Sequence, residues 1–295
     1  MKIKKLISAL VLGSMLAGFS GCNITDFSAE NLLRPPKAVG DEAEIEQLIA
    51  KTADSGYTLK YPKNGKFRSA IIMTDLDGND SNEAVAFFRN SAETSSVHML
   101  VMYSKDNSWE IASDNIFETT DIDSVDFADL TGNGKAEIIV NSTTYTPNVG
   151  KLSCYSYSEG KTNEVGSGQS CSSFVTGDFD NDGTSEIMSL VLYTTENEAL
   201  ASMLDYNEDS KSLYAKAMAN MDPNVVKYKN IAVTKLDNDI TGIVVDGTSA
   251  NEVTNTQVIF YSRDLAILRN PLFKEKAKNI TRRSSQVICS DIDKD

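Results

Sequence analysis

Asp178-Phe-Asp180-Asn-Asp182-Gly-Thr184-Ser-Glu186 is the stretch from which the rest of the chain can be interpreted. Oxygen-bearing side chains occupy its first, third and fifth positions, a glycine stands at the sixth and a glutamate at the ninth. Alternating oxygens let a tightly turning backbone aim several side chains at one cation, and glycine permits the sharp turn. The carboxylate at the ninth position closes the shell, so the stretch predicts a metal-binding loop.

The same nine-residue pattern recurs along the chain. Its first positions lie 49 to 57 residues apart, at Asp75, Asp129, Asp178, Lys235 and Asp291. The fourth copy is degenerate and the fifth is cut off by the end of the sequence. Short runs rich in β-branched and aromatic residues flank each loop and read as strands. About four such runs fill each period, which is typical of β-propeller blades.

The repeats predict an all-β fold. Residues 57–295 would form a β-propeller with about four complete four-stranded blades and part of a fifth, leaving the ring incomplete at the C-terminal end. Ahead of the repeats, the segment from Asp41 to Ala53 predicts one short helix. Its apolar residues share one face, and its acidic first turns suit the helix dipole.

The first residues predict export from the cytoplasm. Three lysines precede an apolar run over 6–19, which is too short to span a bilayer. Cys22 follows small residues, and this segment resembles the lipobox of bacterial lipoproteins, in which the cysteine carries lipid. We expect a lipoprotein signal peptide at 1–21, a lipid-anchored linker and helix at 22–56, and a location on the outer face of the cell membrane. An ordinary signal peptide with an incidental cysteine is the alternative.

The composition limits the partners. Asp and Glu number 42 against 28 Lys and Arg, and the formal charge of −14 argues against nucleic acid as a partner. The single histidine makes a His-rich zinc site impossible. Oxygen-rich loops suit a hard cation, so the expected cofactor is Ca²⁺.

The loops resemble the integrin-type propeller repeats called FG-GAP or VCBS, and in particular bacterial surface lipoproteins built from them. The resemblance covers roughly residues 30–295. It implies that each loop joins the first two strands of a blade and binds Ca²⁺ through positions 1, 3, 5 and 9 and the main-chain carbonyl of position 7. The implied ligands are Asp75, Asp77, Asn79, Ser81 (carbonyl) and Glu83; Asp129, Thr131, Asn133, Lys135 (carbonyl) and Glu137; Asp178, Asp180, Asp182, Thr184 (carbonyl) and Glu186; and, in the truncated copy, Asp291, Asp293 and Asp295.

The loops differ in charge. The third offers four carboxylates, the first three and the second two, so we expect Ca²⁺ to bind most tightly to the third and most weakly to the second. In the fourth copy Lys235 replaces the first acid, and no metal is expected. Lys235 either pairs with Asp237 or Asp239 in place of a cation, or lies in a plain solvated loop.

Other reactive side chains have simpler interpretations. His98 lies in an apolar run and is better explained as a strand histidine with satisfied hydrogen bonds than as a general base. Cys154 and Cys171 could form a disulfide, but two half-buried strand thiols are the interpretation we favour. Cys289 has no evident partner.

The resulting hypothesis is an exported, lipid-anchored, monomeric Ca²⁺-binding propeller. It would act as a non-enzymatic surface module that binds or scaffolds an unidentified protein or glycan. The alternative is a hydrolase or lyase acting on a glycan in the central channel, and a third reading is a stable spacer. Polar residues converging in that channel would favour the enzyme.

Overall fold

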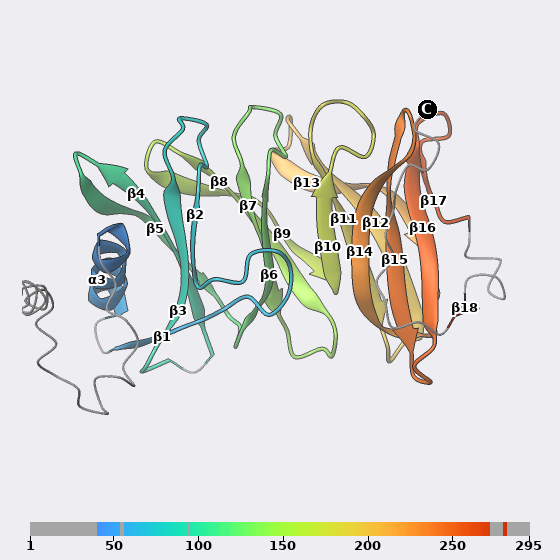
Figure 1. Cartoon of the computed structure of the whole chain (residues 1–295), viewed down its shortest axis with the longest axis horizontal. Helices are drawn as coiled ribbons and strands as arrows, with labels where there is room; N and C mark the ends of the chain where they lie inside the picture. The colour runs from blue at the N-terminus through green and yellow to red at the C-terminus, as the bar shows by residue number, and fades with distance from the viewer. Residues whose placement is uncertain (1–39, 54–55, 94, 272–279, 282–295) are drawn as a thin grey trace, which may run out of the picture. The chain divides into compact units, whose positions relative to one another are not determined.

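The computed structural model describes residues 40–53, 56–93, 95–271 and 280–281 (Figure 1). The chain divides into two compact units between residues 43 and 44, and every sheet belongs to the second. The predicted signal segment, Cys22, Cys289 and the fifth copy of the loop pattern with Asp291, Asp293 and Asp295 lie outside the described residues. Among the described residues, no helix is long and apolar enough to cross a membrane.

The described residues of the second unit form four antiparallel sheets. The second and third sheets follow the chain as meanders, and the first and fourth do so apart from β1 and β18. The first contains β1 (Tyr57–Leu59), β2 (Ile71–Thr74), β3 (Glu83–Asn90), β4 (Val97–Lys105) and β5 (Ser108–Phe117). The second contains β6 (Ile122–Ala128), β7 (Glu137–Thr143), β8 (Gly150–Ser158) and β9 (Lys161–Cys171). The third contains β10 (Ser173–Gly177), β11 (Glu186–Tyr193), β12 (Glu198–Asn207) and β13 (Ser212–Asn220). The fourth contains β14 (Val225–Asp237), β15 (Ile240–Ser249), β16 (Thr254–Ser262), β17 (Ile267–Arg269) and β18 (Ile280–Thr281), which pairs with β16.

The strands occur where the repeat predicts them. Tight turns join them, for example Asp106 and Asn107 between β4 and β5, both with positive φ. Positive φ at two successive residues matches the right-handed twist of a hairpin, and Asp and Asn tolerate it well. Successive antiparallel sheets of four or five strands are consistent with the expected all-β, propeller-like arrangement.

The sheets pack against each other through both faces of the middle strands. In β3, Phe87 belongs to a cluster shared with the second sheet, whereas Phe88 belongs to a cluster on the opposite face. Strand β11 divides in the same way, with Ile187 packed toward the second sheet and Met188 toward the fourth. Successive side chains alternate between faces, and each fully buried one contributes about 1.5–3 kcal/mol. Burial on both faces explains why strands β3 and β11 are nearly continuous apolar runs in the sequence.

Helix α3 (Asp41–Ala53), present over the predicted residues, covers the remaining face of the first sheet. Ile45, Ile49 and Ala53 recur at helical spacing, are buried, and pack against Phe88 and Trp109. The helix thus takes the place that a neighbouring sheet takes elsewhere in the unit.

The first strand of the first sheet is split. Both β1 and β2 pair with β3, and the intervening residues, here called the 60–70 segment, run along strand β6 of the second sheet. The amide of Asn64 donates to the carbonyl of Asp123 at 2.7 Å. The rings of Phe67 and Phe127 meet edge to face with centroids 4.9 Å apart. The 60–70 segment therefore ties the first sheet to the second.

Candidate metal centre

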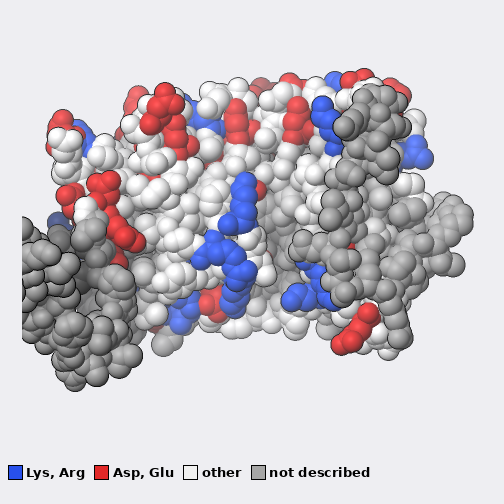
Figure 2. Space-filling model, in the orientation of Figure 1, with Lys and Arg blue, Asp and Glu red and all other residues white. Residues whose placement is uncertain are grey.

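The three intact acidic loops connect the first and second strands of successive sheets. They join β2 to β3, β6 to β7 and β10 to β11, and the closing glutamate is the first residue of each second strand. The connections lie at the upper end of the sheets in Figure 1, where many Asp and Glu side chains gather in Figure 2. The structure thus brings the repeated acidic residues to one end of the sheets.

The first aspartate of each loop organises the turn. Asp75 accepts hydrogen bonds from the amides of Gly78 at 2.8 Å and Asp80 at 2.9 Å. Burial acts to raise the pKa of Asp75, but these backbone hydrogen bonds outweigh it and hold the pKa below its ordinary value. Asp129 and Asp178 accept equivalent hydrogen bonds from glycine amides, at 2.7 and 3.1 Å. The first aspartate therefore fixes the turn in all three loops.

The closing glutamate is held by the second residue of the loop. The carboxylates of Glu83, Glu137 and Glu186 are almost fully buried. Each accepts a hydrogen bond from the amide at position 2, at 2.7 or 2.8 Å. The side chains at position 2 are Leu76, Leu130 and Phe179, which are buried in the core. Sequence reasoning missed this role, although an apolar residue at position 2 of every intact loop was the available signal.

Carboxylates converge in two of the loops. In the third loop, oxygens of Asp178, Asp180, Asp182 and Glu186 all lie within 4.8 Å of one another, and in the first loop those of Asp75, Asp77 and Glu83 do. Among the described residues, Asp77 Oδ1 and Glu186 Oε1 are buried without a hydrogen-bond partner. These clusters could hold a metal ion, and hard oxygen ligands with unpaired buried atoms suit a cation such as Ca²⁺.

The closing glutamates of the loops have raised pKa values, so their ionised forms are disfavoured in the metal-free protein. Burial, followed by repulsion from Asp180 and Asp182, raises the pKa of Glu186 to about 8. Burial likewise raises the pKa of Glu83 and of Glu137 above the ordinary value. A bound cation would reverse this cost, because an adjacent positive charge favours the ionised carboxylate.

The second loop has fewer carboxylates than the other two. It contributes two carboxylates, and Thr131 donates its hydroxyl to Glu137 at 3.1 Å. Adjacent loops are also linked through their backbones: the amide of Ala136 donates to the carbonyl of Leu76, and that of Ser185 to the carbonyl of Asp129. The three loops therefore form one hydrogen-bonded row.

Lys216 is a residue of this region that the loop pattern does not contain. It lies on strand β13, at a β-bulge, and its ammonium group pairs with Asp180 and, at 2.8 Å, with Asp205. Burial acts to lower the pKa of Lys216, but the two carboxylates outweigh it and raise the pKa. The third loop is therefore less negative than its four carboxylates indicate.

The fourth copy is not an open loop. Lys235 and Asp237 lie in strand β14, Asp237 pairs with Ile240, and a tight turn at Asn238 and Asp239 joins β14 to β15. Lys235 is exposed, and the described residues provide it with no ion pair. The solvated alternative thus fits better than an internal ammonium substitute, because the strands extend to a hairpin where the acidic loop is missing.

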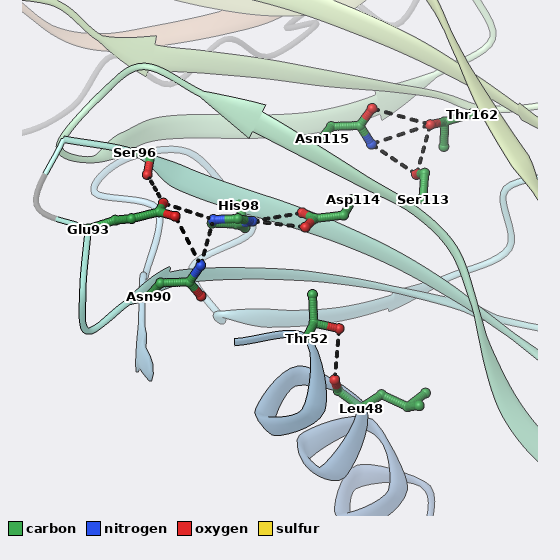
Figure 3. A network of polar contacts seen from close by, with 10 residues as sticks. All are labelled: Leu48, Thr52, Asn90, Glu93, Ser96, His98, Ser113, Asp114, Asn115 and Thr162. Atoms are coloured by element: carbon green, nitrogen blue, oxygen red, sulfur yellow. Dashed lines mark hydrogen bonds and ion pairs between the residues drawn. The ribbon is translucent and has the colours of Figure 1, made fainter. Parts of the chain in front are cut away.

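His98 has the structural role that we predicted (Figure 3). It is buried in β4, stacks on Phe88 with centroids 4.8 Å apart, and Nδ1 lies 2.9 Å from Asp114 Oδ1. Nε2 lies 3.3 Å from a Glu93 oxygen and 3.2 Å from Asn90 Nδ2. Both ring nitrogens are therefore engaged within the first sheet.

Cys154 and Cys171 are free thiols, and they are fully buried rather than half-buried as predicted. Cys154 pairs with Gly166, whereas Cys171 pairs with Gly150, four positions away on β8. Four residues along a strand span about 13 Å. That separation exceeds the roughly 7 Å limit between the α-carbons of a disulfide, so the register explains why the thiols are not joined.

The fold and the loops together define an all-β, propeller-like protein with acidic clusters that could hold metal. No family model and no curated protein matches the chain. Among solved structures it is similar to an exotype rhamnogalacturonan lyase, YesX, with 12% identity and a TM-score of 0.36. The match covers 72% of this chain and 56% of the lyase, so it spans little more than half of the lyase. A likeness this distant carries no inference about activity.

Proposed function

We propose that the chain is an extracytoplasmic, lipid-anchored protein whose propeller-like domain binds Ca²⁺ and acts as a surface binding module. The observation that carries the proposal is the third loop. Four carboxylates converge there, and Glu186 Oε1 is buried without a partner among the described residues. Unpaired buried carboxylate oxygens are costly, and a hard cation is the partner that oxygen ligands of this kind prefer.

The role of the ion would be to make the loop end of the sheets rigid. Each loop is anchored in the core at position 2 and joined to the next loop through its backbone. A cation held by these loops would stabilise the folded state by its preferential binding. The module would then present a pre-organised surface outside the cell, where Ca²⁺ is available. Attachment through Cys22 is the part of this proposal that rests on the sequence motif alone.

Calorimetric titration of Ca²⁺ into the chelator-treated full chain tests the metal site. We expect saturable binding that weakens at least tenfold at the altered site in Glu186→Gln and in Glu83→Gln. Glu118→Gln, an exposed acid outside the loops, is the matched control and should bind as the parent does. Absence of saturable binding at millimolar Ca²⁺ would overturn the proposal.

A glycan-acting enzyme is the competing function. The charge in the cleft beside the first strands, described below, is carried mainly by lysines, which suits retention of an anionic ligand. We therefore propose ligand binding, rather than cleavage of a glycan, as the main function. Product analysis after incubation with an acidic polysaccharide separates the two functions, since cleavage would require the enzyme.

A further inference from the structure

A cleft of about 670 Å³ lies beside the first strands of the second, third and fourth sheets. Strands β6, β10 and β14 contribute to its lining, together with the 60–70 segment and the loop between β7 and β8. The volume falls within the roughly 300–1,000 Å³ of ligand pockets. The cleft is distinct from the acidic loops, because it shares no lining residue with them.

The charge of the cleft opposes the charge of the chain. Its charged lining residues are Lys63, Lys227, Lys229 and a single acid, Asp123, in a protein with a formal charge of −14. Figure 2 shows Lys and Arg side chains over the middle of the face that carries the first strands. A concentration of positive charge in a concave site attracts anions.

The lysines are placed there by the fold. Strand β14 has irregular pairing between Val225 and Lys227 and again between Tyr228 and Asn230. Such bulges redirect side chains. Tyr228 is buried in the core, whereas Lys227 and Lys229 are exposed and have no ion pair among the described residues. Two ammonium groups on one strand are thus available to a ligand.

The acid of the cleft is already satisfied. Asp123 accepts hydrogen bonds from Asn64 at 2.8 Å, from Ser124 at 3.1 Å and from Asn141 at 3.3 Å. On the other side Lys63 pairs with Asp121 at 3.1 Å, but Asp121 is shared with Lys60. The three lysines of the cleft therefore carry more positive charge than Asp123 and the shared Asp121 balance.

A buried acceptor in the lining is also without a partner. Asn141 is 1% exposed, and its Oδ1 accepts no hydrogen bond among the described residues. Gly150 lies directly over it, since a Cβ on Gly150 would come within 2.2 Å of that oxygen. Because Gly150 covers this oxygen, a ligand in the cleft cannot bond to it, and the polar groups open to a ligand lie elsewhere in the lining. Further hydroxyl and amide groups on Thr146, Asn148 and Asn230 line the same cleft.

We propose that this cleft binds an acidic oligosaccharide, whose carboxylates pair with Lys227, Lys229 and Lys63 and whose hydroxyl groups bond to Thr146, Asn148 and Asn230. Carboxylates satisfy the ammonium groups, and sugar hydroxyls satisfy both donors and acceptors. The proposal deepens the binding role proposed above and rests on it. It names the site and the chemical class of the ligand.

Titration of the purified full chain with tetragalacturonate tests the proposal, with neutral galactotetraose and inorganic phosphate as companion probes. We expect saturable binding of tetragalacturonate that weakens as NaCl is raised, at least tenfold weaker binding of the neutral sugar, and no competition by equimolar phosphate. Lys227→Gln/Lys229→Gln should weaken tetragalacturonate binding at least tenfold. Lys105→Gln/Lys161→Gln, at exposed strand ends that do not line the cleft, should leave it unchanged.

Several outcomes would overturn the assignment. These are no binding of tetragalacturonate at millimolar concentration, equal binding of the neutral sugar, equal competition by phosphate, or unchanged binding by Lys227→Gln/Lys229→Gln. Ca²⁺ titration of the same preparation is scored separately. Loss of Ca²⁺ binding with retained tetragalacturonate binding would defeat the metal site alone, and the reverse pattern would defeat the cleft alone.

Discussion

Lys216 pairs with Asp180, one of the four carboxylates that converge in the third acidic loop. Because the ammonium group occupies one side of a carboxylate that the repeat pattern assigns to a cation, it competes with that cation. It also neutralises Asp205, which is buried on strand β12. The number of carboxylates alone therefore overstates how strongly this loop attracts metal.

Replacing Lys216 by valine should tighten Ca²⁺ binding to the third loop by about tenfold and lower the stability of the metal-free protein. The stability loss, about 1–3 kcal/mol, follows from leaving two buried carboxylates without the ammonium group that balances their charge. Calorimetric titration and urea unfolding measure the two effects. Lys211→Val is the control, because Lys211 is largely exposed and its ion pair within the described part of the chain is with the exposed Glu208. Unchanged or weaker Ca²⁺ binding by Lys216→Val would contradict this role.

Chelation should lower the thermal stability of the parent protein. At a free Ca²⁺ concentration 100 times the dissociation constant, one site stabilises the folded state by about 2.7 kcal/mol. Differential scanning calorimetry with Ca²⁺ and with chelator measures the shift. A protein carrying Glu83→Gln, Glu137→Gln and Glu186→Gln together should show little shift, and an equal melting temperature of the parent under both conditions would count against the loops as metal sites.

Asp121 should make stability depend on acid pH. Burial acts to raise its pKa, but hydrogen bonds from Lys60 and Lys63 outweigh burial and lower the pKa. A carboxyl group with a lowered folded-state pKa stabilises the protein above its unfolded value of about 3.9, and this contribution disappears as pH falls through the folded value.

Asp121→Asn should therefore cost about 1 kcal/mol at pH 7 and much less below pH 3. Urea unfolding at the two pH values provides the comparison. Asp264→Asn, an exposed acid without an ion pair among the described residues, should cost little at either pH. A cost for Asp121→Asn that is equal at both pH values would exclude the ion pairs as its cause.

Cys154 and Cys171 should resist alkylation in the folded protein. Both are fully buried, and burial raises the pKa of the Cys171 thiol to about 12 and that of Cys154 well above its ordinary value. The thiolate is the reactive form, so labelling should require unfolding. Peptide mapping after iodoacetamide treatment, with and without urea, checks this. Recovery of a Cys154–Cys171 disulfide peptide from the folded protein would contradict the strand register.

Much of the fold was predictable because its signals are local. The acidic loops identify turns, and the β-branched and aromatic runs beside them identify the strands that those turns join. The helix from Asp41 to Ala53 was identified from its periodicity. In contrast, the split first strand was not predicted: the 60–70 segment leaves the first sheet to pair with β6, and nothing in its own sequence specifies that partner.

The residues of the candidate metal site were likewise predictable only in part. The repeat identified the carboxylates of the loops, but it did not identify the position-2 anchors or Lys216. Bulges on β5, β9 and β13 place Ala112, Val165 and Lys216 at equivalent positions, and only the third of these residues carries a charge. The repeat in the backbone is therefore more regular than the repeat in the side chains.

The periodic strands, the acidic loops and the helix could be predicted without the structure, because alternation, turn chemistry and helical spacing act over a few neighbouring residues. The folded chain was needed to see that Lys216 lies against Asp180, and that Lys63 and Lys227 line one cleft beside Asn141. Those contacts join residues from different strands or sheets. Their geometry depends on how whole sheets pack, which no local pattern encodes.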